Sequence, residues 1–265
     1  MEITRRNYPT DITDKEWIIL EPFFHPPGKK GRGARRTPER TRECLNATRY
    51  LLKTGCQWRM LPHGYPPRST VHDAFQKWTA DGTLSQINGR LRGEAGEQMG
   101  RDPEPSIGII DSQSVKASDT VPAGSSGYDA GKKIKGRKRH LLVDSLGLVI
   151  GVHVGPASVQ DRAGARLLAA MVLTLALSIC VVFADGGYGG EPLAGWFASV
   201  RPGLKLEIVK KDPNAKGFSV LKKRWVVERT NGWLMKKRRL AREYERNPRN
   251  TEGFILMTMI GIMTK

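Results

Sequence analysis

Residues 139–154, RHLLVDSLGLVIGVHV, hold two apolar runs on either side of the segment Asp-Ser-Leu-Gly. Asp, Ser and Gly favour a tight turn, and the runs beside them are rich in valine, leucine and isoleucine. The stretch therefore predicts a β-hairpin. Two shorter apolar runs lie further out, IGII at 107–110, which ends at Asp111, and CVVFA at 180–184, which ends at Asp185. Each predicts a buried strand followed by an acid.

Helices are predicted between and after these strands. One begins near Asp161, a second covers residues 191–200, and a last long helix covers about 219–243, with a strand at 206–209 before it. Residues 112–136, rich in Ser, Gly and Lys, are predicted to form a loop. The order strand, hairpin, helix, strand, helix, strand, helix is that of a ribonuclease H-like fold, an α/β class in which helices flank a mixed sheet.

The chain carries a large positive charge. Its 265 residues include 44 Lys and Arg against 26 Asp and Glu, a net charge of +18 at pH 7. This excess indicates a polyanionic partner, either nucleic acid or an anionic membrane surface. The apolar stretch 167–184 has roughly the length of a membrane span, but its β-branched end favours a buried helix followed by a strand. No apolar segment follows the N-terminus, so we expect a cytoplasmic protein.

The first hundred residues differ in texture from the rest. They are basic, and Pro- and Gly-rich breaks separate helical runs, with helix starts at Thr37 and Ser69. A polar linker at 93–105 precedes the strands. We therefore predict a small, basic, mainly helical, DNA-binding domain at residues 1–100 and a ribonuclease H-like α/β domain at 106–265. Two of the helices could form a helix-turn-helix, a point that the sequence leaves open.

Three acids stand out because of the elements that carry them. Asp111 and Asp185 each follow a predicted strand, and Glu228 lies inside the last helix, with Trp225 and Met235 at helical spacing from it. A carboxylate on an apolar helix face is costly unless an ion pair or a metal ion compensates it. Carboxylates on rigid elements near strand ends are the ligands that two Mg²⁺ ions need for phosphoryl transfer. Turn formation at the two aspartates and an ion pair at Glu228 are the alternatives.

Cations gather near these acids in two segments. Residues 132–139 read KKIKGRKR and lead into the hairpin, and the last helix carries further Lys and Arg around Glu228. Such runs are often merely solvated, but their position beside the acids favours contact with a phosphate backbone. The residues predicted to contact DNA are Lys132, Lys133, Lys135, Arg137, Lys138, Arg139, Arg224, Arg229 and Lys236.

Structural roles are predicted for the remaining candidates. Asp144 fits the hairpin turn, and Asp161 fits a helix N-cap. His140 lies on a predicted strand without the spacing of a metal ligand. The two tryptophans of the last helix, Trp225 and Trp233, are expected in the core rather than against nucleic acid bases.

Several blocks of the chain, in this order, resemble the DDE-class transposases of bacterial insertion sequences, of the short type with a helical N-terminal module. The blocks are CQWRMLPHGYPPRSTVHDAFQKW (56–78), GYDAGKKIKGRKRHLLVDSLGLVI (127–150), ASVQDRAGA (157–165), ADGGYGG (184–190) and RWVVERTNGWL (224–234). The likeness covers nearly the whole chain. It departs from the family pattern after ERT, where Asn-Gly replaces the more usual pair of an aromatic and a small residue.

The resemblance implies that Asp111, Asp185 and Glu228 are the catalytic, metal-binding acids of a ribonuclease H-like domain. It matches Arg224, four residues before Glu228, with a family arginine, and Lys236 more loosely with a family lysine. The implied cofactors are two Mg²⁺ or Mn²⁺ ions per site. The departure after ERT leaves the activity of this copy open.

The implied partners are double-stranded DNA, both element ends and target, and further copies of the chain in a homo-oligomeric synaptic complex. The implied reaction cuts DNA at the element ends and joins the freed 3′-hydroxyl to target DNA. No membrane partner is implied, and the implied location is the cytoplasm, in association with the nucleoid. One alternative is a catalytically inactive, domesticated transposase that acts as a DNA-binding protein, although the presence of all three acids argues against it. Another is a nuclease of the same fold that cuts without joining.

Overall fold

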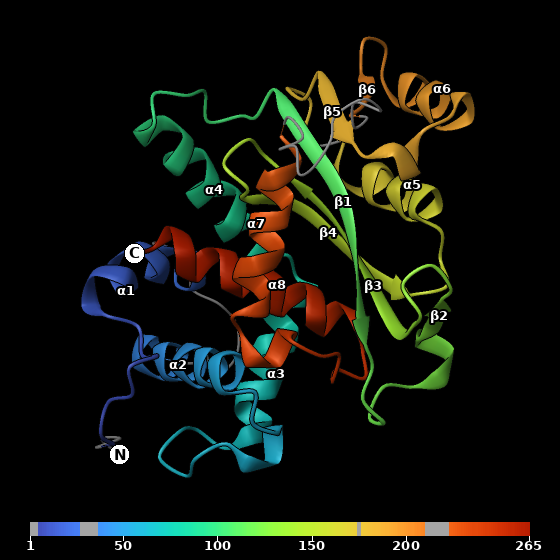
Figure 1. Cartoon of the computed structure of the whole chain (residues 1–265). Coiled ribbons are helices and arrows are strands. Elements are labelled where there is room, and N and C mark those ends of the chain that lie inside the picture. The colour runs from blue at the N-terminus through green and yellow to red at the C-terminus, as the bar shows by residue number, and fades with distance from the viewer. Residues whose placement is uncertain (1–4, 27–36, 174–175, 210–222) are drawn as a thin grey trace.

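A mixed sheet forms the centre of the α/β part of the protein (Figure 1). The computed structural model describes residues 5–26, 37–173, 176–209 and 223–265. The strands are β1 (Ile107–Lys116), β2 (Gly127–Asp129), β3 (Ile134–Val143), β4 (Val149–Pro156), β5 (Val181–Ala184) and β6 (Lys205–Ile208).

The strand order confirms the predicted ribonuclease H-like architecture. The sheet runs β2-β3-β1-β5-β6, and β4 pairs with β3. β1 is antiparallel to β3 and parallel to β5, and β5 is parallel to β6. The predicted hairpin is the β3–β4 pair, and Asp144 forms its turn by accepting hydrogen bonds from the backbone N–H groups of Leu146 and Leu148.

Helices cover the sheet, and four of those in the described residues precede its first strand in the chain. They are α1 (Asp14–Phe24), α2 (Pro38–Thr54), α3 (Arg68–Ala80), α4 (Thr83–Gln98), α5 (Asp161–Val172), α6 (Glu191–Val200), α7 (Arg224–Met235) and α8 (Pro248–Met263). Thr37 caps α2 as predicted, because its side chain accepts a hydrogen bond from the backbone N–H of Arg40. Asp161 is the first residue of α5 and Gln160 is its N-cap, so the N-cap prediction for Asp161 was wrong.

β1 is longer than predicted. The sequence indicated a strand that ends at Asp111 and a loop from residue 112, but β1 continues to Lys116. The cause is β3, which begins at Ile134 and supplies antiparallel partners to every residue from Ser112 to Lys116. Polar residues within a strand are tolerated here because the partner strand satisfies their backbone groups.

The predicted last helix is shorter, and a further helix follows it. α7 ends at Met235, a 3₁₀ turn lies at Arg238–Leu240, and α8 begins at Pro248 behind the N-cap Asn247. The predicted start at residues 219–222 lies outside the described residues. α8 was missed because it is apolar nearly all round and shows no amphipathic period. Its residues 250–260 are almost all buried, as expected for a central helix.

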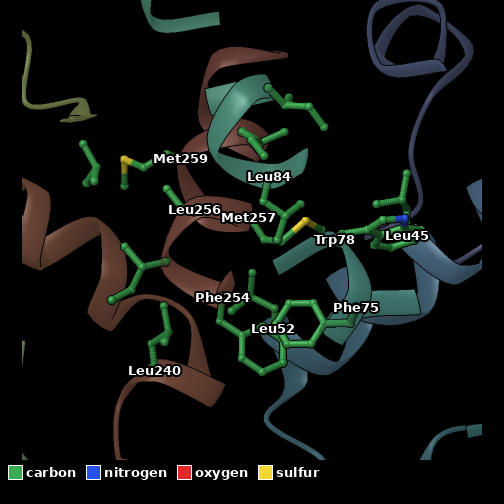
Figure 2. Close-up of a cluster of buried hydrophobic side chains, with 14 of the residues drawn as sticks. Leu45, Leu52, Phe75, Trp78, Leu84, Leu240, Phe254, Leu256, Met257 and Met259 are labelled. Carbon is green, nitrogen blue, oxygen red and sulfur yellow. The ribbon is translucent and has the colours of Figure 1, made fainter. Parts of the chain in front are cut away.

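α8 is the centre of a large hydrophobic cluster that joins the N-terminal helices to the sheet (Figure 2). The Phe254 ring stacks on Phe75 of α3 with 4.4 Å between ring centroids. Gly253 permits this approach, since a Cβ there would lie 2.5 Å from Thr79 Oγ1. A second cluster lies between the sheet and the helices α5 and α6. The division into domains at 1–100 and 106–265 stays a prediction, and α1–α4 share their core with α8.

The apolar stretch 167–184 divides into the end of α5 and the strand β5, as predicted. α5 is amphipathic rather than apolar all round, because Leu168 is buried while Leu167 and Met171 are about half exposed. Among the residues that the structure describes, there is no helix with the length and hydropathy needed to cross a membrane.

We expect Phe254→Ala to lower the free energy of unfolding by about 3–5 kcal/mol, because it removes a fully buried ring and leaves a cavity beside Phe75. Urea unfolding followed by tryptophan fluorescence measures this. The matched control is Met60→Ala, at a side chain that is 68% exposed, for which we expect a change below about 0.5 kcal/mol. Similar losses in the two variants would contradict the central place of α8.

Candidate active site

Two of the predicted acids lie side by side because of the pairing of β1 with β5. Ile109 is the register partner of Phe183 in this parallel pair. Asp111 and Asp185 each lie two residues further along, and parallel strands run in the same direction, so the two carboxylates come side by side where the β1–β5 pairing ends. Both line one small cleft together with Arg224 of α7.

Asp111 is in an electrostatically unfavourable position. Its burial raises the pKa of its carboxyl to about 6, and the negative charge of Asp185 adds to this rise. The backbone N–H of Ser112 and the positive charges of Arg224 and Lys132 oppose it. Two carboxylates that share a partly buried cleft repel each other, and a bound cation would relieve that repulsion.

Arg224 links the third acid to this pair. Its Nη2 atom lies 3.8 Å from Asp185 Oδ2 and 3.6 Å from Glu228 Oε1. Arg224 and Glu228 are four residues apart on α7 and therefore share one face of the helix. The guanidinium thus stands between the carboxylates of two different elements. Within the described ranges, there is no group of three or more Asp, Glu, His or Cys side chains arranged to hold a metal ion.

Glu228 does not lie on an apolar helix face, so that prediction was wrong. The buried residues of α7 are Val226, Val227, Thr230 and Leu234, and the Glu228 side chain is 57% exposed. Its supposed apolar neighbours, Trp225 and Met235, are 47% and 41% exposed. The Glu228 carboxylate is therefore solvated and paired with Arg224, which is the ion-pair alternative that the sequence left open.

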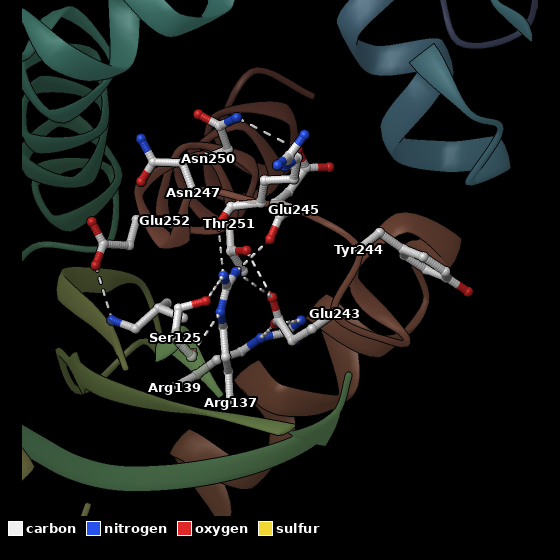
Figure 3. Close-up of polar contacts among 12 residues, drawn as sticks. Ser125, Arg137, Arg139, Glu243, Tyr244, Glu245, Asn247, Asn250, Thr251 and Glu252 are labelled. Carbon is white, nitrogen blue, oxygen red and sulfur yellow. Dashed lines mark hydrogen bonds and ion pairs between the residues drawn. The ribbon is translucent and has the colours of Figure 1, made fainter. Parts of the chain in front are cut away.

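Two cations predicted to contact DNA are instead sealed inside the protein. Arg137 and Arg139 are fully buried, on the face of β3 that packs against the chain before α8 (Figure 3). Arg139 Nε donates to Glu243 Oε1 at 2.7 Å, and Arg137 Nη1 donates to the carbonyl of Glu245 at 2.7 Å. The signal missed in the sequence was REYERN at 242–247, which supplies the Glu243 carboxylate and the backbone carbonyls that pair with these arginines.

Lys138 points to the opposite face of β3 and is also buried. Its Nζ atom lies 3.0 Å from Asp161 Oδ1 and 3.4 Å from Asp129 Oδ2. Asp161 also accepts a hydrogen bond from Ser112 Oγ at 2.7 Å. This cluster therefore stands directly behind Asp111. The DNA-contact prediction is corrected for Arg137, Lys138 and Arg139, because no phosphate can reach a side chain that is already paired in the interior.

The other predicted cations are accessible. Lys132, Lys133 and Lys135 are exposed, and Lys132 Nζ donates to the carbonyl of Ser112, next to Asp111. Arg229 and Lys236 are exposed on α7 or at its end. These five, with the partly exposed Arg224, are the members of the predicted phosphate-contact set that solvent can reach, and of them Lys132 and Arg224 lie beside the acids.

The two tryptophans of α7, Trp225 and Trp233, differ in their burial. The Arg229 guanidinium lies between their rings, 4.7 Å from the Trp225 centroid and 4.8 Å from that of Trp233. Trp233 packs against the main core cluster, as predicted, but Trp225 is about half exposed, so its assignment to the core was wrong.

Sequence reasoning missed Tyr188, which follows Asp185 in the ADGGYGG block. It is almost fully buried, and its hydroxyl makes no hydrogen bond within the described structure. Burial raises the pKa of this phenol well above its usual range, and the charges of Asp111 and Asp161 raise it further. His140 lies on a strand, β3, as predicted, and its ring stacks on that of His153 from β4.

The sheet order, with Asp111 in β1 beside Asp185 at the end of β5, defines the ribonuclease H-like class. The chain matches the family described as "Transposase DDE domain" over residues 102–263, and that described as "Putative transposase of IS4/5 family" over residues 12–88. The chain belongs to the DDE transposase family of insertion sequences, for which divalent-metal dependence and DNA binding are the rule. It is also 29% identical over 111 residues to "Insertion element IS402 uncharacterized 16.2 kDa protein" of Burkholderia cepacia, a match that covers 40% of this chain and 73% of the relative.

We predict that Asp111→Asn stabilises the metal-free protein near pH 8 by about 3 kcal/mol, since its pKa is raised from 3.8 to about 6 and each pKa unit corresponds to about 1.4 kcal/mol. The folded-state pKa of Asp111 lies above its unfolded value, so ionisation disfavours folding. This penalty is complete above about pH 6 and shrinks as the pH falls towards 4. Thermal melts in EDTA at several pH values measure it, with the exposed Asp73→Asn as control. A gain in stability that does not change with pH would contradict the assignment.

Proposed function

We propose that the protein binds the ends of its mobile element and catalyses metal-dependent DNA cleavage and strand transfer with Asp111, Asp185 and Glu228. The observation that carries this proposal is the cleft shared by Asp111 and Asp185, which lies where the parallel pairing of β1 with β5 ends. Support for the third acid is that one guanidinium, that of Arg224, lies within 4 Å of both Asp185 and Glu228.

The donor set fits Mg²⁺ or Mn²⁺, since its members are hard carboxylate oxygens. Asp111 and Asp185 would hold such an ion between them. The raised pKa of Asp111 shows that its ionised form is disfavoured by burial and by the charge of Asp185, and a bound cation would offset that free-energy cost. Glu228 would join them as the exposed ligand on α7, once its carboxylate leaves Arg224. Two ions bound in this way supply activation of the attacking oxygen and stabilisation of the leaving oxygen.

The side chains around the acids have distinct roles in the proposal. Arg224, released from the carboxylates, faces the scissile phosphate and offsets its negative charge. Lys132 stands beside Asp111, and Lys133 and Lys135 continue the exposed basic edge along which a DNA backbone would lie. Arg229 and Lys236 extend the same contact along α7. These residues position the strand, whereas the three acids act at the reacting phosphate.

We also propose that the protein works as a homo-oligomer, in which two copies hold the two element ends. Cutting both ends and joining them to one target requires two active sites in one complex. The basic surface beside each site would bind the end that the site cuts, and the target duplex would cross both.

The test is cleavage of a labelled duplex built from the sequences that flank the gene, in Mg²⁺ and in Mn²⁺. We expect Asp185→Asn and Glu228→Gln to lose at least 100-fold in rate, because each removes a ligand charge, while binding persists. Glu207→Gln, at an exposed position on β6, is the control and should keep full activity.

The products separate the competing functions. Cut ends joined to a target duplex support a transposase, whereas cut ends alone indicate a nuclease. Binding without cleavage by the unaltered protein would overturn the proposal in favour of an inactive, DNA-binding copy. Full activity of Glu228→Gln would remove Glu228 from the site.

A further inference from the structure

A cleft of about 490 Å³ lies between the N-terminal helices and the chain that follows α7. α1 and α2 form one wall, the C-terminal end of α8 forms another, and Lys237 enters from the segment after α7. Five cations line it, from four parts of the chain: Lys15, Arg49, Lys53, Lys237 and Lys265.

Positive charge in this cleft is not balanced. The two acids of its lining are already engaged, Asp11 with Arg5 at 2.6 Å and Glu16 with Arg49 at 2.8 Å. For the described residues, neither a hydrogen bond nor an ion pair is found at the side chains of the four lysines. Those lysines are Lys15, Lys53, Lys237 and Lys265.

Lys237 is the most informative of the four because it is partly buried. Burial lowers the pKa of its ammonium group, and the charges of Lys53, Arg49 and Lys265 lower it further. A cation that loses water and gains only like-charged neighbours costs free energy. Such an arrangement becomes favourable when an anion occupies the space between the cations.

We propose that this cleft binds the phosphate backbone of the DNA, at a second contact region separate from the acids. The inference rests on the proposed function, since it takes DNA as the partner. Lysines present point charges without a fixed bidentate geometry, which suits a backbone that passes through rather than a small anion held in a cage. Counterions released from each neutralised phosphate supply the affinity.

The position of the cleft relative to the acids fits a duplex. α7 carries Glu228 and ends at Met235, two residues before Lys237. In Figure 1, α7 runs from the β1–β5 end of the sheet down towards the N-terminal helices. At about 1.5 Å per residue the helix spans roughly 10 Å between Glu228 and its end, the rise of about three base-pair steps. One duplex could therefore contact the acids and, a few base pairs away, the cleft.

The test is the salt dependence of binding of the full chain to a fluorescein-labelled duplex, measured by anisotropy in EDTA. We expect the double variant Lys53→Gln/Lys237→Gln to reduce the slope of log K against log salt by about 1.8, since each lost phosphate contact contributes about 0.9. The matched control, Lys77→Gln/Lys205→Gln, removes two exposed charges outside the cleft and should change the slope by less than half as much. Equal changes in both would mean diffuse attraction and overturn the proposal.

Two further measurements guard this result. Thermal melts of Lys237→Gln without DNA should show equal or higher stability, because an uncompensated cation has been removed; a clear loss would indicate a structural role and overturn the proposal. Inorganic phosphate should not stabilise the unaltered protein at low millimolar concentration. If it does so while the DNA slope of the double variant is unchanged, the cleft is a small-anion site. The binding assay in EDTA does not depend on cleavage. If the protein binds DNA through the cleft but does not cut it when Mg²⁺ or Mn²⁺ is supplied, the proposed function is contradicted and this inference still stands.

Discussion

The parallel pairing of β1 with β5 is the constraint on which the site depends. It fixes the register Ile109 to Phe183 and so brings Asp111 and Asp185, distant in sequence, side by side in one cleft. A shift of one residue in either strand would turn one of the two carboxylates to the other face. The same strand β1 is held on its other side by eight residue pairs with β3, which makes the Asp111 backbone rigid. The sheet therefore positions Asp111 and Asp185, whereas Glu228 is carried by α7.

A buried ion network ties this sheet to the rest of the chain. Arg139 and Arg137 reach Glu243 and the backbone at Glu245, while Arg239 donates to Glu245 and to the carbonyl of Cys56. Breaking such a buried pair by removing one partner costs about 3–5 kcal/mol, because the other charge is left uncompensated. The network joins β3, the chain before α8 and the loop after α2. The position of the N-terminal helices relative to the acids, and hence of the proposed phosphate cleft, depends on it.

Much of the fold was predictable from the sequence because its strands and turns carry strong local signals. The hairpin around Asp144 and the acids after two apolar runs needed no tertiary information. The failures have a common physical cause, which is that burial is a property of the folded chain. KKIKGRKR is a uniform run of cations in sequence, but strand alternation buries Arg137 and Arg139 on one face and Lys138 on the other. Glu228 was selected because its helix face was taken to be apolar, although that face is exposed. α8 was missed because a helix that is apolar nearly all round has no amphipathic period.

In the proposed site, Asp111, Asp185 and Glu228 come together around divalent ions. The most direct measurement replaces Mg²⁺ with Fe²⁺ in the full chain and maps the backbone cuts made by hydroxyl radicals generated at the bound iron. We expect cuts near residues 111, 185 and 228 that excess Mg²⁺ suppresses and that Asp185→Asn abolishes. Cuts at β1 and β5 but none on α7, or cuts that excess Mg²⁺ does not suppress, would contradict this site.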